Sequence, residues 1–310
     1  MREQSYKIRR YRLGDLDKLA KLAAEIQGLE HPHCCNLLHS MIENLCMPNC
    51  CPEHNLFVVD VAGTIVGCAD VVPELRIGRV VLCCLLHPKH RTRTLTRELL
   101  TQAMDRATQL EADIIHALVT ENNMITRNLL SSMGFRAVRR FLEMRLDLST
   151  IPLLELKRVT GQYRQLRHGE EDLIAEIQNR AFGNSWGYNP NTAEEIMYRI
   201  RQMNFSTADV IVVCDADKPA GYCWIKTKVR EKDSPDGRTG RIHMLGVDPY
   251  YWGKGVGKQV LMAALYHLKT NDVRFVELTV DSENEAACVL YTLAGFEVWT
   301  NSIWYEKTIR

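Results

Sequence analysis

The stretch RIHMLGVDPYYWGKGVGKQVLMAAL, residues 241–265, decides the fold of the second half of the chain. Residues 241–247 read as a strand, and residues 257–270 have the apolar spacing of an amphipathic helix. Between them lies a loop with glycines at positions 253, 255 and 257. Glycines let the backbone approach a ligand closely, and the amides that begin a helix attract anions. The sequence therefore predicts a binding loop for a phosphorylated ligand, with Lys254 and Lys258 adding positive charge.

Two common phosphate-binding loops do not fit this stretch. A Walker A loop needs glycine at 252 and Ser or Thr at 259, where Trp252 and Gln259 stand. A dinucleotide fingerprint starting at Gly253 needs glycine in place of Lys258. The pattern Arg/Gln-x-x-Gly-x-Gly/Ala does fit, with Trp252 as its one departure. In this respect the loop resembles the pyrophosphate loop of the GNAT acyltransferase superfamily.

A second segment, VDSENEAACVLYTLAGFEV at residues 280–298, strengthens this resemblance. It is similar to the signature Asn-x-x-Ala-x-x-Leu-Tyr-x-x-x-Gly-Phe of the same superfamily. The matching positions are Asn284, Ala287, Leu290, Tyr291, Gly295 and Phe296. The segments 177–188 and 221–227, together with the overall length, resemble the tandem-domain, mycothiol synthase-like group within it.

The two halves of the chain are copies of one another. Residues 87–135 align without a gap to residues 248–296, and eight of these 49 positions are identical, where about three are expected by chance at average residue frequencies. A repeat this long indicates duplicated domains rather than a solenoid. We expect an N-terminal domain over 1–150 and a C-terminal domain over 160–310, joined around Pro152.

The expected fold class is α/β (α+β), with two tandem GNAT-like domains, each a mixed, mostly antiparallel sheet flanked by helices. Patterns in the second copy predict strands and helices. The strands are 162–167, 209–214, 220–229, 241–247, 274–280 and 298–307. The helices are 170–182, 192–203, 257–270 and 285–293.

The resemblance implies acetyl-CoA as cofactor and an amine as acceptor. Tyr291 matches the family's general acid, and Asn284 matches the residue that bonds the pantetheine arm. The complete cofactor-binding set that the resemblance implies is Leu245, Gly246, Val247, Trp252, Gly253, Lys254, Gly255, Val256, Gly257, Lys258, Asn284 and Tyr291.

The general base is less well defined. The mycothiol synthase-like pattern has an acidic residue where this chain has Arg241. His243 lies two residues further along the same predicted strand and therefore faces the same side. A histidine can accept an ammonium proton near neutrality, and Asp281 is a second candidate. Arg241 would suit an acceptor that carries a carboxylate or a phosphate.

Aromatic residues of the second copy flank the expected entrance of the acceptor. Phe182, Trp186, Tyr188 and Trp224 would suit the wall of a small-molecule pocket. The alternative is that at least two of them belong to the core. The predicted substrate-binding set is Phe182, Trp186, Trp224, Arg241 and Asp281.

The first copy departs from the pattern. Its three loop glycines are replaced by Thr92, Thr94 and Thr96, and the tyrosine is replaced by Leu130. Threonine resists positive φ angles and adds bulk to the phosphate path. We therefore expect a degenerate N-terminal domain and a catalytic C-terminal one. Lys89, Arg91, Arg93 and Arg97 surround the same loop; they could hold a polyanion or form a solvated surface.

The segment 31–54 contains five cysteines and four histidines. Such residues can bind zinc, but the spacing matches no finger pattern, and buried cysteine often serves as a small hydrophobe. We predict no metal site here.

Composition narrows the class of protein. The chain has 310 residues, a net charge of +1 and 46% hydrophobic residues, which indicates a globular protein and no nucleic-acid partner. No secretory signal or membrane-spanning stretch is recognised, so a cytoplasmic location and no membrane partner are expected. The chain is expected to be a monomer or a homodimer. The leading hypothesis is an N-acetyltransferase for a small-molecule amine. The alternatives are a non-catalytic acyl-CoA sensor and a protein or peptide N-acetyltransferase.

Overall fold

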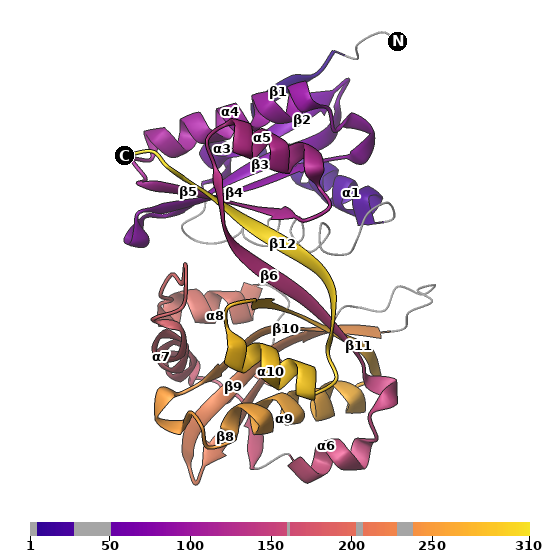
Figure 1. The fold of residues 1–310 in the computed structure, drawn as a ribbon, viewed down its shortest axis with the longest axis vertical. Coiled ribbons are helices and arrows are strands. Elements are labelled where there is room, and N and C mark those ends of the chain that lie inside the picture. The colour runs from indigo at the N-terminus through magenta and orange to yellow at the C-terminus, as the bar shows by residue number, and fades with distance from the viewer. Residues whose placement is uncertain (1–4, 28–50, 160–161, 203–206, 228–237) are drawn as a thin grey trace. The chain divides into compact units, whose positions relative to one another are not determined.

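A computed structural model describes residues 5–27, 51–159, 162–202, 207–227 and 238–310 (Figure 1). The chain forms two compact units. The first unit contains Met1–Arg140 and Asn301–Arg310, and the second contains Phe141–Thr300. Among the described helices, none is both long and apolar enough to cross a membrane.

The first unit is a mixed sheet with helices on its faces. Its strands are ordered β1-β2-β3-β4-β5 and end with the C-terminal part of β12. Only the β4–β5 ladder is parallel among the ladders described for this unit. The elements are β1 (Lys7–Arg10), α1 (Leu16–Gln27), α3 (Pro52–Asn55), β2 (Leu56–Val61), β3 (Thr64–Glu74), β4 (Arg79–Leu86), α4 (Arg93–Gln109), β5 (Ile114–Thr120) and α5 (Met124–Ser132).

The second unit repeats this plan in the order β7-β8-β9-β10-β11-β6, with β10 and β11 parallel. Its strands are β6 (Arg136–Asp147), β7 (Tyr163–Gln165), β8 (Val210–Asp215), β9 (Lys218–Thr227), β10 (Arg238–Val247) and β11 (Val273–Asp281). The last strand, β12 (Glu297–Thr308), begins in this unit and continues into the first. The helices of the second unit are α6 (Leu153–Val159), α7 (Glu171–Phe182), α8 (Ala193–Gln202), α9 (Val256–Thr270) and α10 (Glu285–Leu293). This arrangement confirms the expected fold class.

The strands that close the two sheets are exchanged between the copies. Residues 302–308 of β12 pair with β5 of the first unit. Residues 141–147 of β6 pair with β11 of the second unit. The sequence-based boundaries, 1–150 and 160–310, assign each closing strand to its own copy. They differ from the compact units because a repeat in sequence carries no information about which sheet a strand joins.

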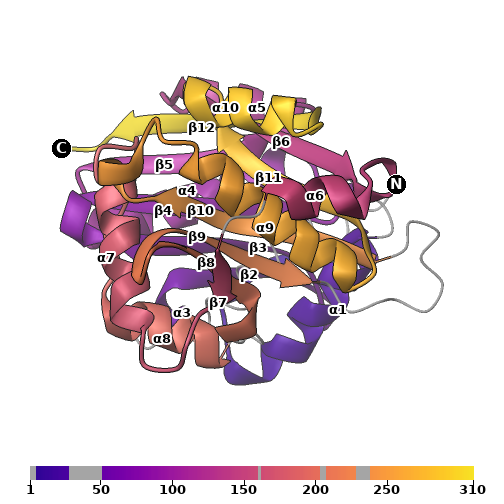
Figure 2. The ribbon, with the colours of Figure 1, turned by 90° about the horizontal axis from the view of Figure 1, so that it is seen from below.

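Two apolar clusters cover the two faces of the sheet in the second unit, and Figure 2 shows the helices that provide them. On one face, α9 packs against alternate residues such as Ile242, Leu278 and Met144. On the other face, α7 and α8 pack through Ile174, Ile177, Ile196 and Ile200 against strand residues that include Tyr222 and Trp224. The alternation along each strand decides which side chains face the site described below.

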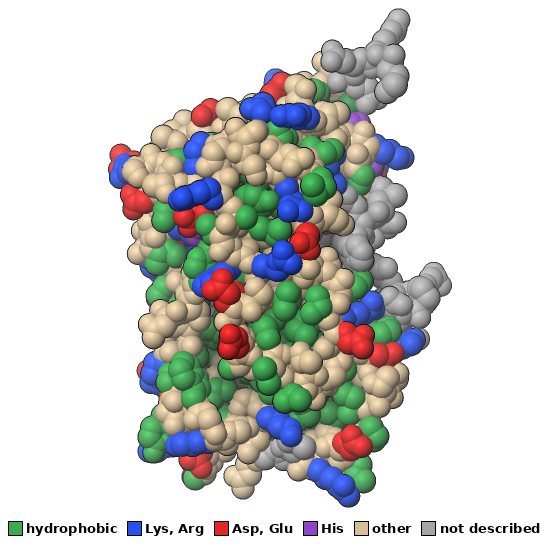
Figure 3. Space-filling view, viewed as in Figure 1, with side chains coloured by type: hydrophobic (Ala, Val, Ile, Leu, Met, Phe, Trp, Pro, Cys, Tyr) green, Lys and Arg blue, Asp and Glu red, His purple; other side chains and the backbone are tan. Residues whose placement is uncertain are grey.

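The surface of the second unit also carries apolar side chains. Val289 and Leu293 on α10 are exposed, and Figure 3 shows hydrophobic side chains over this helix, interspersed with charged ones.

Candidate active site

Strands β10 and β11 separate in the middle of the second sheet. Their parallel ladder ends at the pair Ile242 and Leu278, although β10 continues to Val247 and β11 to Asp281. Beyond the last pair, the β11-facing edge of β10 no longer takes part in this ladder. The backbone amides of Leu245 and Val247, two members of the predicted cofactor-binding set, lie in this opened stretch.

A β-bulge places His243 at the start of the opening. Ile242 pairs with Ile225 and Met244 pairs with Trp224, so His243 is the additional residue of β10. Ile242 packs on the α9 side and Met244 on the α7/α8 side. The bulge therefore directs both His243 and Met244 to the α7/α8 side, the side that Arg241 also faces. Bulges commonly redirect side chains next to active sites.

His243 is predominantly neutral at physiological pH. The residue is exposed to solvent, yet the protein atoms around its ring desolvate the imidazole. Desolvation lowers its pKa to about 3, and the positive charges of Arg241, Lys226 and Arg199 act in the same direction. The ring is therefore free of a proton at neutral pH, and desolvation first, then the neighbouring positive charges, make it a weak base.

The loop before α9 has the backbone of an anion-binding site. Gly253 and Gly255 have φ angles of 73° and 79°, which favour glycine. The first hydrogen bond at the start of α9 joins the Gln259 amide to the Gly255 carbonyl. The amides of Val256, Gly257 and Lys258 precede it and have no partner within the helix. Gly255, as the N-cap, offers no side chain to cap them.

The other loop residues are held at the surface. The Trp252 indole is 58% exposed and donates a hydrogen bond of 2.9 Å to the Val247 carbonyl. The Lys254 ammonium lies 4.1 Å from the centre of the Tyr250 ring, a cation–π contact. Lys258 is exposed beside the open amides. All of these positions leave room for a ligand over the loop.

Tyr291 and Asn284 belong to α10. Tyr291 is buried, and its ring packs edge-to-face with Phe296 at 5.8 Å. Burial raises the pKa of Tyr291 far above its usual value, so the phenol keeps its proton at neutral pH. Asn284 caps α10, because its side-chain oxygen accepts a hydrogen bond from the Ala287 amide. Its side-chain NH₂ is not used by this cap.

Arg241 is held by a buried acidic cluster. Its guanidinium bonds the Thr279 hydroxyl and lies 3.3 Å from the Glu143 carboxylate and 3.9 Å from the Glu277 carboxylate. Both glutamates are 4% exposed. The Thr279 hydroxyl also donates a 2.7 Å hydrogen bond to Glu143. The positive charge of Arg241 is therefore compensated by protein carboxylates.

The sequence analysis missed these glutamates. Glu143 comes from β6, which lies inside the N-terminal domain as the sequence defines it, and only the strand exchange brings it to this site. Glu277 alternates with apolar residues along β11, so the sequence does not separate it from a solvent-facing residue.

The residues that were predicted to bind the acceptor substrate lie in different surroundings. Phe182 stacks at a tilt on Tyr188 with the ring centres 5.7 Å apart, and Trp186 packs edge-to-face with Phe141 at 6.2 Å. Trp224 is 4% exposed and lies in the apolar cluster below α7 and α8. Asp281 ends β11 and accepts a hydrogen bond from the Glu283 amide.

Gly246 is required by close packing. A Cβ atom there would lie 2.7 Å from the Tyr222 ring and 3.3 Å from the Phe182 ring. This glycine therefore lets Tyr222 lie directly over β10, next to the opening.

In the first unit, the loop that corresponds to 253–257 is part of a helix. Thr92 is the N-cap of α4, and its hydroxyl accepts a hydrogen bond from the Leu95 amide at 3.3 Å. The Thr96 hydroxyl donates to the Thr92 carbonyl at 2.7 Å. Helix α4 begins at Arg93, which aligns with Lys254, so it starts two residues earlier than α9.

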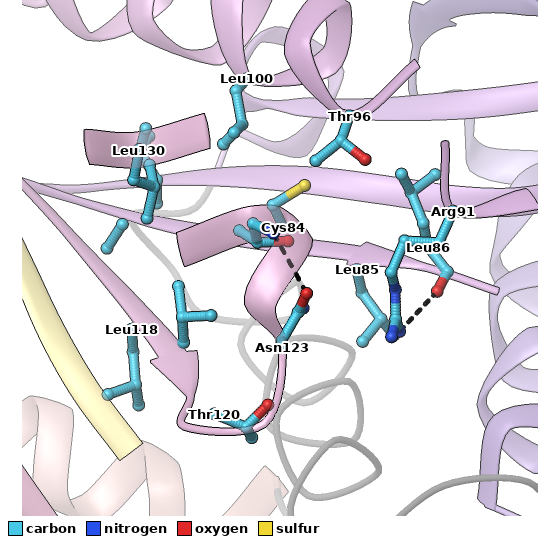
Figure 4. A pocket seen from close by; sticks show the side chains of 14 residues that line it. Cys84, Leu85, Leu86, Arg91, Thr96, Leu100, Leu118, Thr120, Asn123 and Leu130 are labelled. Atoms are coloured by element: carbon cyan, nitrogen blue, oxygen red, sulfur yellow. Dashed lines mark hydrogen bonds between the residues drawn. The ribbon is translucent and has the colours of Figure 1, made fainter. Parts of the chain in front are cut away.

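The first unit also has an opening between its parallel strands, but side chains line it closely (Figure 4). The β4–β5 ladder ends at the pair Leu82 and Ala117. Leu130 is fully buried in the position of Tyr291. The Arg91 guanidinium turns back and donates to the Leu86 carbonyl at 3.0 Å. Burial raises the pKa of Cys84 to about 12, so this thiol is not a nucleophile at neutral pH.

Most of the cysteine- and histidine-rich segment, residues 28–50 of the chain, lies outside the described residues. Within the part that the structure describes, no group of three or more metal-ligating side chains occurs.

Comparison with known proteins agrees with this geometry. The family model described as "Acetyltransferase (GNAT) family" matches residues 20–135 and 172–296. The chain belongs to the GNAT acetyltransferase family, with one match in each copy, which confirms the resemblance seen in the sequence.

Individual relatives make the family comparison more specific. Mycothiol acetyltransferase of Propionibacterium freudenreichii subsp. shermanii is 31% identical over 182 residues, which cover 58% of this chain and 57% of that protein. The chain thus spans less than three fifths of the length of this relative. Mycothiol acetyltransferase of Saccharopolyspora erythraea is 27% identical over 270 residues, which cover 83% of this chain and 86% of that protein.

Solved structures share the two-copy fold. A GCN5-related N-acetyltransferase from Sphaerobacter thermophilus superposes with a TM-score of 0.73 at 19% identity, covering 98% of this chain and 96% of that one. A tandem GNAT protein from the clavulanic acid biosynthesis pathway gives a TM-score of 0.72 at 18% identity and covers 98% of both chains. At these identities the similarity concerns the fold.

Proposed function

We propose that the second unit transfers an acetyl group from acetyl-CoA to the primary amine of a small molecule by direct attack, and that the first unit does not catalyse. The observation that carries this proposal is the uncapped start of α9. Its open amides lie on the same unit as the separated strands β10 and β11 and the buried phenol of Tyr291. The first unit lacks the first and the last of these features.

The residues present suit CoA. The amides from Trp252 to Lys258 would hold the diphosphate, since Gly253 and Gly255 keep the space above the loop clear: a Cβ atom at either position would meet no atom within 4 Å. The Asn284 side-chain NH₂ would bond the pantetheine arm. When bound, acetyl-CoA supplies the activated acetyl group as a thioester.

The proposed reaction needs hydrogen bonds to the carbonyl oxygen, a proton donor and a proton acceptor, and the second unit has a group for each. The amides at Leu245 and Val247 would donate hydrogen bonds to the carbonyl oxygen on which negative charge develops. Tyr291 holds its proton at neutral pH and would donate it to the departing sulfur. His243 would accept the proton of the amine, directly or through water, because the residue is exposed and its ring is neutral.

The test combines a binding and a turnover measurement. Acetyl-CoA is titrated calorimetrically into the wild-type chain and into Gly255→Glu, and thiol release is followed with a panel of small amines, peptides and proteins. The proposal requires one binding site that Gly255→Glu removes, and thiol release with small amines. Absence of binding overturns it. Binding without thiol release supports a sensor, and release with peptides or proteins alone supports a protein acetyltransferase.

A further inference from the structure

The chain connects the opened strand to the following helix in the same way in both units. Strand β10 ends at Val247, and strand β4 ends at Leu86. Each end is followed by a short 3₁₀ turn, Pro249–Tyr251 in the second unit and Pro88–His90 in the first. The two connections therefore share their backbone course, although the loops that come after them differ.

The carbonyl that ends each strand points into the opening. In a trans peptide, a carbonyl and the amide of the next residue point in opposite directions. The Asp248 amide bonds the Ala220 carbonyl of β9, so the Val247 carbonyl faces away from β9 and toward β11. The Leu86 carbonyl likewise faces away from β3, because the His87 amide bonds that strand. Both carbonyls lie beyond the last pair of the parallel ladder described for their unit.

A side chain at the end of the connection bonds this carbonyl in both units. Trp252 donates its indole N–H to the Val247 carbonyl at 2.9 Å. At the aligned position, the Arg91 guanidinium donates to the Leu86 carbonyl at 3.0 Å (Figure 4). Two chemically different side chains thus make the same contact, which ties the start of the loop to the end of the strand. Trp252 departs from the Arg/Gln pattern of this position but keeps a donor for the contact.

We propose that Trp252 is a positioning residue for acetyl-CoA, because its indole N–H fixes the spacing between the strand opening and the anion loop. This inference rests on the proposed transferase activity. Val247 ends the strand whose amides would bond the thioester carbonyl, and Gly253 begins the loop whose amides would hold the diphosphate. Acetyl-CoA has to reach both places at once. A spacing that is fixed in advance lowers the cost of ordering the site when it binds.

A different role for Trp252 would be to stack on the adenine base of CoA, since its side chain is 58% exposed. Stacking needs the aromatic ring and not the N–H, whereas positioning needs the N–H and not the ring. The aligned contact of Arg91 favours positioning, because a side chain without an aromatic ring makes the same bond there. The two roles predict opposite results for substitution by phenylalanine and by arginine.

The test compares two ligands by calorimetry. Acetyl-CoA spans the opening and the loop, whereas adenosine 3′-phosphate 5′-diphosphate, the part of CoA without the pantetheine arm, reaches only the loop. The readout is the ratio of the two affinities. An added charge at the loop or a lost stacking contact changes both affinities alike and leaves this ratio constant. A change in spacing weakens acetyl-CoA alone.

Two variants of Trp252 separate the ring from the donor. Trp252→Phe keeps a ring and loses the N–H, so the ratio should fall about fivefold, the equivalent of one hydrogen bond of about 1 kcal/mol. Trp252→Arg loses the ring and supplies the donor that reaches the carbonyl in the first unit. Its ratio should stay within about twofold of the wild-type value.

Two control variants should change neither affinity. Arg91→Met removes the corresponding bond of the first unit, where no acetyl-CoA site is proposed. Trp299→Phe replaces an indole elsewhere in the second unit, one that contacts the Arg145 guanidinium. Thermal unfolding of every variant shows that it is folded.

The outcomes distinguish this proposal from the transferase proposal. A wild-type ratio in Trp252→Phe, or a ratio that Trp252→Arg lowers as much as Trp252→Phe, overturns the positioning role and leaves the transferase proposal intact. Weaker binding of both ligands to Trp252→Arg, with neither weakened in Trp252→Phe, identifies adenine stacking and also overturns it. Absence of acetyl-CoA binding to the wild-type chain overturns both proposals.

Discussion

The two copies differ most clearly at the start of helices α4 and α9, which follow the parallel strands β4 and β10. In the second unit, Gly253 and Gly255 hold left-handed turns and leave the first amides of α9 open. In the first unit, Thr92 caps α4 with its own hydroxyl, and the aligned loop has become helical. A ligand could satisfy the amides of the second unit, whereas the first unit satisfies an amide internally. The comparison shows that the threonine cap of the first unit occupies an amide of the kind that the glycine loop of the second unit leaves without a side-chain cap.

The largest expected effect is at Tyr291, the proposed general acid. Tyr291→Phe should lower turnover by about 10²–10⁴-fold, the usual contribution of acid catalysis, and leave acetyl-CoA affinity nearly unchanged. Steady-state thiol release and calorimetry measure the two quantities. Leu130→Phe, at the aligned position in the first unit, is the matched control and should not alter turnover. Equal turnover in Tyr291→Phe and wild type would remove this residue from the mechanism.

The second largest effect is expected at the glycine loop, residues 253–257. Replacing Gly253, Gly255 and Gly257 with threonine gives the second unit the loop of the first. Acetyl-CoA affinity should fall by about 10³-fold, because two charge-assisted hydrogen bonds of about 2 kcal/mol each are lost. The reverse change, glycine at Thr92, Thr94 and Thr96, serves as the control. We expect it to create no second site in the same titration, because Arg91 stays folded onto the Leu86 carbonyl. Unchanged affinity in the threonine variant would show that the loop does not hold CoA.

A third difference between the two units concerns two equivalent pairs of residues on neighbouring strands. Asp70 in the first unit pairs with Cys83, and Trp224 in the second pairs with the aligned Met244. Burial raises the pKa of Asp70 to about 7 from 3.8. The folded unit therefore keeps a proton that the unfolded chain has lost, so stability falls as pH rises between these two values.

Between pH 5 and pH 8 this contribution amounts to about 3 kcal/mol. Asp70→Asn mimics the protonated carboxyl and should remove it from the pH dependence of unfolding, measured by denaturant titration. Asp217→Asn, an exposed change in the second unit, should keep the wild-type slope. A slope that persists in Asp70→Asn contradicts the assignment.

The smallest effect is at the cap. Thr92→Ala should destabilise the first unit by about 1 kcal/mol, the usual contribution of an N-cap hydroxyl. Hydrogen exchange of the α4 amides measures the loss locally. Thr101→Ala, an exposed position within α4, provides the comparison. A loss no greater than that of Thr101→Ala would mean that Thr92 does not act as a cap.

The sequence predicted the features that depend on local pattern. The amphipathic period of α9, the glycine spacing at 253–257 and the helical pattern of residues 285–293 are all encoded within a few residues. The roles assigned to Tyr291 and His243 remain predictions, although the structure places both residues on the second unit near the opening of β10.

Features that depend on distant strands were not accessible. The bulge at His243 arises from register between β9 and β10, which a single strand does not reveal. Glu143 reaches Arg241 only through the β6–β11 ladder, 98 residues away in sequence. The sequence gives Tyr222 the pattern of an ordinary strand residue, and only the structure shows that Gly246 packs against its ring. Long-range pairing decided each of these positions.

The exchanged closing strands have a consequence for synthesis of the protein. Domains usually fold as units, N-terminal first, as the chain emerges from the ribosome. The first unit cannot do so, because its sheet ends with residues 302–308 and its core includes Ile303 and Tyr305. All the strands that pair within the sheet of the second unit have been synthesised once the chain reaches residue 281. The copy that is translated first is therefore completed last, and until then β5 presents an unpaired edge.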